Sequence, residues 1–476
     1  MGSIWEKSWQ MPRRGRLEKN ICADAAVIGG GMAGVLTARA LGRAGLRAVV
    51  LEAGRLGGGA TGHTTAKVTA QHGLFCAALL RAAGPADARL YARANLAAVE
   101  DFRRMVRQEN IDCDWEDCAA AVYGGRRAVL EVEAAAARRL GLPVTLTAST
   151  SELPFETAGA VWLEGQARFH PLKFLAAAAE PLEVYEHTPV RRVEGDTRLT
   201  PGGRVRATAV VFACHYPFVD FPGLYFARMY QQRSYVVALE GAPLPDAVYI
   251  GAGPEGLSLR RWQNYLLLGG GGHRTGEADK GGYPPLLAQA EKWFPGSRPA
   301  ARWSAQDCMT PDGLPYVGRY APSRPNWYVA TGFHKWGMTG SMLAAKLLAN
   351  MICGRPDPLA AVVSPRRFSA AALGRALAQG RQAVKGLARR FLPAGAGPDS
   401  LAPGSGGVIR LEGETVGAWR EADGRLCVVD LRCPHMGCRL EWNPHERSWD
   451  CPCHGSRFDR YGRLLDGPAQ KEARYG

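Results

Sequence analysis

A glycine fingerprint near the start of the chain limits the fold more than any other feature. Gly29, Gly31 and Gly34 form a G-x-G-x-x-G motif that follows the apolar run 25–28 and opens a helical stretch, and a second apolar run ends on Glu52. This is a βαβ unit of about thirty residues, which favours a parallel sheet. The glycines allow a pyrophosphate to approach the helix N-terminus, and Glu52 can accept hydrogen bonds from ribose hydroxyls. The unit predicts an α/β domain that binds a dinucleotide.

A second match to the same motif lacks this context. Gly251, Gly253 and Gly256 precede the segment 257–268, which predicts a β-hairpin rather than a helix. No helix N-terminus is then available for a phosphate, so we interpret this match as a glycine-rich loop and not as a second nucleotide site.

Length and composition narrow the class of protein. A chain of 476 residues is too long for one core, so two or three domains are expected. The net charge of +15 is spread along the chain without a nucleic-acid recognition motif, so nucleic acid is not an expected partner. No apolar run predicts a transmembrane helix, and the N-terminal residues show no signal-peptide pattern. A cytoplasmic protein is therefore expected.

Cysteines and histidines alternate near the end of the chain. Cys433-Pro434-His435 and Cys451-Pro452-Cys453-His454 form a C-x-H…C-x-x-H pattern with fifteen residues between the two parts. A Cys2His2 zinc site is one interpretation, but zinc fingers normally space their thiolate pair as C-x-x-C, so the tighter C-x-H pair disfavours it. The pattern resembles the Rieske 2Fe-2S domain, over about residues 404–476.

The resemblance to a Rieske domain implies a small all-β fold and a ligand set. It implies that Cys433 and Cys451 bind one iron and that His435 and His454 bind the other. Imidazole ligation raises the reduction potential of such a cluster relative to one held by four cysteines.

The residues around these ligands resemble those of the Rieske proteins of cytochrome bc complexes. CPHMGC and CPCHGS are the matching motifs, and they imply a disulfide between Cys438 and Cys453. They also imply that Ser456 donates a hydrogen bond to a cluster sulfide. Phe458 stands where those proteins have a tyrosine donor, and the loss of one donor predicts a lower reduction potential.

A second resemblance covers about residues 20–355. Besides the glycine fingerprint, its motifs are a glycine-rich loop ending at His63, the strand AVVFAC, the block TPDGLPYVG and the stretch ATGFHKWGMTGSMLAAKLL. Together they resemble the D-amino-acid oxidase superfamily, which includes glycine oxidase and sarcosine oxidase. The resemblance implies an FAD enzyme that removes a hydride from a carbon next to nitrogen. The residues implied to bind FAD are Gly29, Gly30, Gly31, Gly34, Glu52, Arg55, Gly59, Ala60, Thr61, His63, Thr64, Val190, Ala213, Gly332, Gly337, Met338 and Thr339.

These resemblances predict an α/β FAD-binding domain interrupted by an α+β substrate domain, followed by a small all-β Rieske domain. A basic stretch, 366–392, is helical in pattern; we interpret it as a connecting helix rather than a membrane-surface or partner-docking helix. The expected bounds are 1–355 for the oxidoreductase (FAD-binding parts 20–85, 155–215 and 319–355; substrate domain 86–154 and 216–318), 356–403 for the helix and linker, and 404–476 for the Rieske domain.

Five residues are candidates for the chemistry at the flavin. Asp307 stands where the glycine oxidase branch has an arginine that grips the substrate carboxylate, which favours a cationic amine or moves the grip to Lys335 or Arg260. A loop or cap carboxylate is an equal alternative for Asp307. His63 matches a histidine that is joined covalently to flavin in the dimethylglycine and sarcosine dehydrogenase branch, although contact without a bond is expected here. Lys67 is a candidate for polarising flavin or oxygen.

The two resemblances together predict an oxidoreductase that oxidises a small amine or imino compound and passes electrons singly from FAD to the cluster. The expected partners are that substrate and an electron acceptor, protein or quinone, that the sequence does not name. A reductase running in the opposite direction and a redox-sensing or electron-transfer module without turnover are the alternatives. A Rieske oxygenase is disfavoured, because the ten histidines show no H-x4-H spacing for a mononuclear iron.

Overall fold

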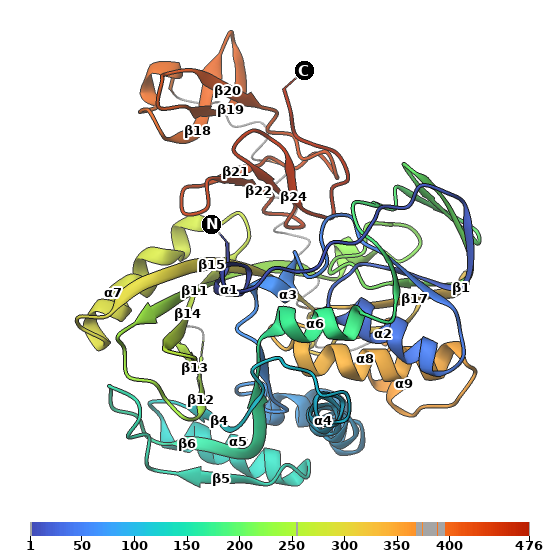
Figure 1. The fold of residues 1–476 in the computed structure, drawn as a ribbon. Helices are drawn as coiled ribbons and strands as arrows, with labels where there is room; N and C mark the ends of the chain where they lie inside the picture. Colours follow the sequence, from blue (N-terminus) through green and yellow to red (C-terminus); the bar gives the residue numbers. More distant parts are fainter. Residues whose placement is uncertain (1, 254–255, 368–373, 375–387, 389–395, 476) are drawn as a thin grey trace.

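The computed structural model describes residues 2–253, 256–367, 374, 388 and 396–475 (Figure 1). Two large sheets with their helices are followed by two small sheets at the C-terminal end. The basic helix expected over 366–392 falls almost entirely outside the described residues. None of the helices in the described ranges is long and apolar enough to cross a membrane.

A mostly parallel sheet carries the glycine fingerprint. Its layer contains β1 (Ile21–Ile28), α2 (Met32–Arg43), β2 (Ala48–Leu51), α6 (Pro171–Ala179), β7 (Glu183–Tyr185), β8 (Arg192–Glu194), β9 (Thr197–Thr200), β10 (Gly203–Phe212), β16 (Tyr316–Ala321), β17 (Arg324–Thr331), α8 (Gly337–Ile352) and α9 (Leu359–Val362). The strand order is β16-β17-β10-β1-β2-β7, with β1 parallel to both β10 and β2. Helix α2 starts within the fingerprint, directly after Gly31, and packs against α8. The predicted α/β fold is confirmed.

A second, mixed sheet forms the interrupting domain. Its elements are β3 (Lys67–Val68), α4 (Cys76–Gln108), β4 (Glu116–Tyr123), α5 (Arg127–Arg139), β5 (Val144–Thr147), β6 (Ala160–Arg168), η1 (Tyr225–Ala227), β11 (Tyr230–Glu240), β12 (Val248–Gly251), β13 (Ser258–Trp262), β14 (Tyr265–Arg274), η2 (Ala278–Lys280), α7 (Tyr283–Trp293) and β15 (Arg298–Met309). The order β15-β11-β14-β13-β12-β4-β6-β3 makes β11 and β15 neighbours at one edge. β13 and β14 form the hairpin predicted after the second glycine motif.

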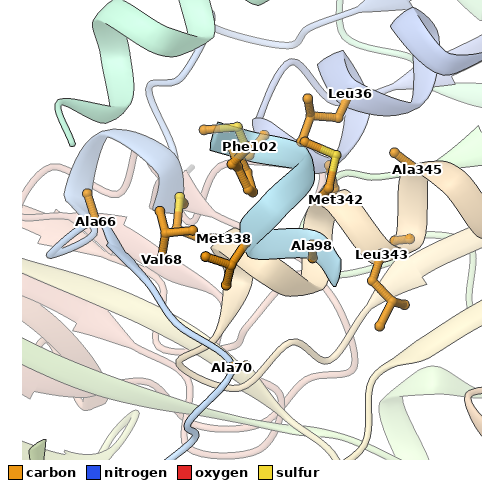
Figure 2. Close-up of a cluster of buried hydrophobic side chains, with 14 of the residues drawn as sticks. Leu36, Ala66, Val68, Ala70, Ala98, Phe102, Met338, Met342, Leu343 and Ala345 are labelled. Atoms are coloured by element: carbon orange, nitrogen blue, oxygen red, sulfur yellow. The ribbon is translucent and has the colours of Figure 1, made fainter. Parts of the chain in front are cut away.

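A shared apolar core joins the two large sheets. Figure 2 shows Leu36 of α2, Phe102 of α4 and Met338 and Met342 of α8 in this core, with Val68 of β3 beside them. These side chains are buried, so the start of α8 and the segment around β3 are held against each other by packing. The core therefore fixes two segments that carry predicted flavin-site residues.

The N-terminus adds an element that the sequence analysis did not predict. Helix α1 (Ile4–Ser8) begins with a capping box in which Ser3 and Glu6 bond reciprocally. Trp5 is fully buried, and its indole N–H donates to the carbonyl oxygen of Thr64 at 2.7 Å. This contact holds the loop that follows α3 (Ala60–His63).

The C-terminal domain is all-β, as predicted. Its elements are η4 (Pro398–Ser400), β18 (Gly406–Leu411), β19 (Glu414–Arg420), β20 (Leu426–Val429), β21 (Glu441–Asn443), β22 (Ser448–Asp450), β23 (Arg457–Asp459) and β24 (Leu464–Asp466). The sheets β18-β19-β20 and β21-β22-β23-β24 are antiparallel. The C-x-H motif precedes β21 and the C-x-x-H motif joins β22 to β23, so both lie in loops at the same sheet.

Candidate functional site

The glycine fingerprint forms a cradle at the N-terminus of α2. Gly29 has φ +112°, and a Cβ there would overlap the backbone of Ala213 on the neighbouring strand. A Cβ on Gly34 would overlap the carbonyl oxygen of Gly29, so only glycine allows α2 to pack so close to β1. Gly31 caps α2 without a side-chain hydrogen bond. The N–H of Met32, the first residue of α2, donates to the hydroxyl of Thr61 at 3.0 Å, and a helix N-terminus that follows such a glycine turn suits an anion such as a pyrophosphate.

Glu52 closes the other side of this cradle. Its carboxylate accepts the N–H groups of Gly30 at 2.6 Å and Gly54 at 2.7 Å. Burial raises the pKa of Glu52 although these N–H groups oppose the shift. Arg55, predicted to bind FAD, pairs at 3.3 Å with the buried Glu186, so its guanidinium is already engaged.

The loop at α3 and the start of α8 carry most of the other residues that are predicted to contact FAD. His63 Nδ1 lies 2.9 Å from the Gly59 carbonyl oxygen, and its Nε2 lies 3.9 Å from the carboxylate of Glu6. At the start of α8, the Thr339 hydroxyl donates to the Thr69 carbonyl oxygen at 3.3 Å. His72, which the sequence analysis did not select, stacks on a neighbouring indole and lies 3.3 Å from Thr339 Oγ1.

Three of the predicted catalytic residues lie near one another. Lys67 Nζ donates to the hydroxyls of Thr65 and Ser258 at 2.7 Å each. Burial, together with the charges of Arg260 and Lys335, lowers the pKa of Lys67 to about 7. An ammonium group near neutral pKa can hold or release a proton at physiological pH.

Asp307 is the second member of this group. Burial raises its pKa, while the charge of Lys335 and a 2.9 Å hydrogen bond from the Ser234 hydroxyl oppose that shift. Lys335 lies close enough to act on both Asp307 and Lys67, and its own side chain is exposed. Ser234 and Ser258 are members of this site that carry no recognisable sequence motif.

Arg260 is placed differently from the other candidates. It is buried, and its guanidinium donates to the carbonyl oxygens of Thr65, Ala66, Phe169 and Arg261. Its charge acts on Lys67, but its donors hold the backbone that carries Lys67. The geometry favours a supporting role over the predicted grip on substrate.

The edge strands β11 and β15 separate this group from the C-terminal domain. Gln232 pairs with Asp307 and Arg233 pairs with Gln306 in their antiparallel register. Because successive side chains of a strand point to opposite faces, Gln306 and Asp307 face opposite ways. Gln306 and Arg233 are buried, whereas Gln232 and Asp307 are partly accessible.

The C-terminal domain packs against the buried face of these strands. Gln306 Nε2 donates to the Gly455 carbonyl oxygen at 2.8 Å, and Gln231 Nε2 donates to that of His454 at 2.7 Å. Glu446 of the C-terminal domain forms an ion pair with Arg233, with Oε1 2.5 Å from Nη2 and Oε2 2.9 Å from Nε. These contacts bind the C-x-x-H loop, and the turn that carries Glu446, directly to the sheet.

The C-x-H and C-x-x-H loops bring like ligands together. The thiols of Cys433 and Cys451 hydrogen-bond to one another, and the imidazole centroids of His435 and His454 are 4.9 Å apart. Nδ1 of each histidine is buried and, within the described part of the chain, has no hydrogen-bond partner. Two buried imidazole nitrogens without a partner beside two thiols are the donor set that a histidine-ligated 2Fe-2S cluster requires.

The surroundings of these ligands match the predicted Rieske pattern. Cys438 and Cys453 form a disulfide, as predicted, and the Cys451 sulfur lies within 4.8 Å of both of their sulfurs. Ser456 is buried and hydrogen-bonds to the Cys433 thiol. Phe458, at the position of the missing tyrosine donor, is also fully buried.

Comparison with known families agrees with this geometry. The family model for FAD dependent oxidoreductases matches residues 24–351, which is more than half of the chain. The chain belongs to the FAD dependent oxidoreductase family. Its C-terminal part, residues 396–475, matches the Rieske [2Fe-2S] domain.

Relatives of this FAD dependent oxidoreductase support the assignment of the Rieske domain. YhfW of Bacillus subtilis (strain 168), described as a Rieske 2Fe-2S iron-sulfur protein, is 34% identical over 493 aligned residues, covering 98% of this chain and 96% of YhfW. The cytochrome b6-f complex iron-sulfur subunit 2 of Trichormus variabilis is 38% identical over 66 residues, covering 13% of this chain and 37% of that protein. That likeness is confined to the Rieske part.

Solved structures resemble the oxidoreductase part. Glycine oxidase from Geobacillus kaustophilus has a TM-score of 0.62 at 21% identity, covering 73% of this chain and 99% of that one. L-proline dehydrogenase from P. horikoshii has a TM-score of 0.62 at 17% identity, covering 75% and 98%. At these identities the likeness shows the fold.

The cofactors of this oxidoreductase are FAD and a Rieske 2Fe-2S cluster. The residues present fit both: the glycine cradle with its helix N-terminus suits the FAD pyrophosphate, and the two unpaired imidazole nitrogens with two thiols suit the cluster. Cys433, Cys451, His435 and His454 would hold the cluster. The individual contacts to FAD and the five catalytic candidates stay predictions.

Proposed function

We propose that this oxidoreductase oxidises a small amine or imino compound and that its electrons leave through the Rieske domain. When bound, FAD takes up a hydride from the carbon next to nitrogen, and the cluster accepts the electrons one at a time. The chain's own residues supply the proton chemistry, the grip on the substrate and the path between the two sites.

One observation carries the proposal of an internal electron path. Gln306 and Asp307 are consecutive residues of β15: Gln306 donates to the Gly455 carbonyl oxygen beside the cluster ligands, whereas Asp307 faces Lys335 and Ser234 on the other side. A single strand thus contacts the C-x-x-H loop on one face and the group of catalytic candidates on the other, which supports the proposed path. The next residue, Cys308, is buried, and its Sγ lies 3.9 Å from Oε1 of Gln231, which contacts the Rieske domain.

Lys67 is suited to accept the substrate proton. A protonated amine has no free lone pair on nitrogen, so hydride removal from the adjacent carbon is favoured once that proton leaves. With a pKa of about 7, a neutral Lys67 can take the proton at Nζ. The hydroxyls of Thr65 and Ser258 hold Nζ in place, and Arg260 holds the backbone beneath it.

Asp307 is suited to orient a cationic group of the substrate. Its carboxylate is fixed by the Ser234 hydroxyl and lies on the accessible face of β15. A carboxylate at this position attracts an ammonium and repels a substrate carboxylate. This favours amines or imines over simple amino acids.

Anaerobic mixing with a panel of amines and amino acids tests the proposal. The flavin absorbance should bleach first with a cationic amine, and the signal of the reduced cluster should follow. Reduction of the cluster before the flavin by an external donor, with later turnover of an imine, would favour the reductase. Failure of every amine, imine and amino acid to bleach the flavin would contradict the proposal and favour a module without turnover.

A further inference from the structure

A carboxylate of the flavin-binding part touches a predicted cluster ligand. His435 Nε2 lies 3.0 Å from both carboxylate oxygens of Asp220, which belongs to the loop between β10 and η1. The His435 side chain is only 5% exposed, and Phe226 of the adjoining η1 lies edge-on with its ring centroid 6.4 Å from that of His435. The loop is anchored to the parallel sheet, because the hydroxyl of Tyr320 in β16 donates to the carbonyl oxygen of Val219.

We propose that Asp220 is a positioning residue for the cluster, whose carboxylate orients the His435 ring and lowers the reduction potential of the cluster. A metal-bound histidine commonly donates its other ring N–H to a carboxylate, which fixes the tautomer and makes the ligand more electron-donating. With Nε2–H donating to Asp220, Nδ1 is the free ligand nitrogen, and it is the atom left without a partner among the described residues.

The negative charge of Asp220 determines the direction in which the reduction potential changes. Reduction adds an electron to the cluster, and a carboxylate one imidazole away makes that addition less favourable. The other histidine faces the opposite charge: the Arg274 guanidinium acts on His454 and donates to the Pro452 carbonyl oxygen at 3.3 Å. The oxidoreductase part therefore acts on the two ligands differently, and its anionic contact is made through His435.

The contact between Asp220 and His435 also covers the imidazole side of the cluster site. Asp220 covers His435, while Phe226 lies edge-on at 5.8 Å from the His454 ring. Both covering residues lie in the segment between β10 and β11, so within the described residues this one segment covers the imidazole edge. Asp220 thus couples the position of the Rieske domain to the electronic state of its cluster.

Redox titration of the purified holoprotein with a chemical reductant, followed by electron paramagnetic resonance at fixed pH, tests this role. The D220N variant keeps the shape of the side chain and removes the charge, so its midpoint potential should rise and its g values should shift. The matched control is Q470A, because Gln470 donates at 3.4 Å to the Phe218 carbonyl oxygen of the same loop without touching either histidine. Its potential and g values should equal those of the wild type.

A midpoint potential for D220N equal to that of the wild type and Q470A would overturn the proposal and reduce the contact to domain docking. Should D220N assemble no cluster, D220S carries the same test: a raised potential supports the role, and an unchanged one overturns it. No substrate is present in this titration, so its failure and the failure of the amine chemistry are separate results.

Discussion

The two faces of β11 and β15 are both polar, yet their side chains are used differently. On the face that meets the Rieske domain, Gln231, Gln306 and Arg233 are buried and paired with backbone or carboxylate oxygens of that domain. On the opposite face, Asp307 is partly accessible. Desolvation raises the pKa of its carboxyl group, and the charge of Lys335 opposes that rise. Paired polar groups fix a geometry, whereas charged groups with shifted pKa values are available for chemistry. We therefore call the side of β11 and β15 that meets the Rieske domain the docking face, and the side that carries Asp307 the reaction face.

Removal of a cluster ligand should have the largest effect of all, and that effect should be confined to the Rieske domain. The H454A variant loses one of the two imidazole nitrogens proposed to bind the second iron, so the low-temperature signal of a reduced histidine-ligated cluster should disappear completely. FAD absorbance should remain, because the glycine cradle lies in the other domain.

The matched control for H454A is S456A, which removes hydrogen bonds to Cys433 and to the Ala469 N–H but none of the four proposed ligands, and should retain the signal. A histidine-ligated cluster signal in H454A at the wild-type level would contradict the ligand assignment.

Breaking the ion pair between Arg233 and Glu446 on the docking face should have the next largest effect. In E446Q the buried Arg233 loses its charged partner, which should lower the free energy of unfolding by about 3 kcal/mol. Chemical denaturation measures this. The control E472Q alters an exposed pair with Arg474 and should change stability by less than about 0.5 kcal/mol.

Acidification offers a second test of the same pair. Burial alone would raise the pKa of Glu446, but the charges of Arg233 and Arg457 more than reverse this and hold it well below its usual range. Its contribution is therefore present above the unfolded pKa of about 4.3 and is lost as pH falls from there through the folded pKa. Equal losses of stability on acidification in wild type and E446Q would contradict the role given to this pair.

On the reaction face, Lys67 should control the pH dependence of flavin reduction. If neutral Lys67 accepts the substrate proton, the rate rises with pH through an apparent pKa of about 7. The K67M variant should slow anaerobic flavin reduction about 100-fold and lose this pH step. K346M, which alters an exposed lysine paired with Asp101, is the control. If a pH step near 7 survives in K67M, the step belongs to another group and the role given to Lys67 is wrong.

The smallest predicted effect concerns substrate recognition. D307N should raise KM for a cationic amine about tenfold, equivalent to about 1.4 kcal/mol, with little change in kcat. Steady-state kinetics measure this, and D423N, at an exposed turn, is the control. An equal rise in KM for a neutral analogue would show that Asp307 is a structural loop carboxylate.

The sequence predicted those parts that depend on local chemistry. The glycine fingerprint, the second motif without a helix and the hairpin after it rest on short patterns with a physical reason, and the structure contains each of them. The Cys438–Cys453 disulfide was implied by the resemblance to Rieske proteins, and the structure contains it as well. Lys67, Lys335 and Asp307 were selected for their residue type and place, and the fold brings them near one another.

Contacts between distant segments were beyond the sequence analysis. Gln231, Gln306 and Asp220 belong to no motif, and their importance comes from the Rieske domain that packs on them. Trp5 was missed because its burial depends on packing against an α3 loop about sixty residues away. Arg260 looked like a free cation, but four carbonyl oxygens that no local pattern reveals surround it.

Transfer of electrons across β15 is the central claim, and light-driven reduction of the bound FAD in the absence of substrate tests it most directly. Samples frozen at intervals after illumination should show the reduced-cluster resonance growing while the oxidised-flavin absorbance partly recovers. A flavin that stays reduced beside a cluster that stays oxidised, in protein with full iron content, would contradict the account.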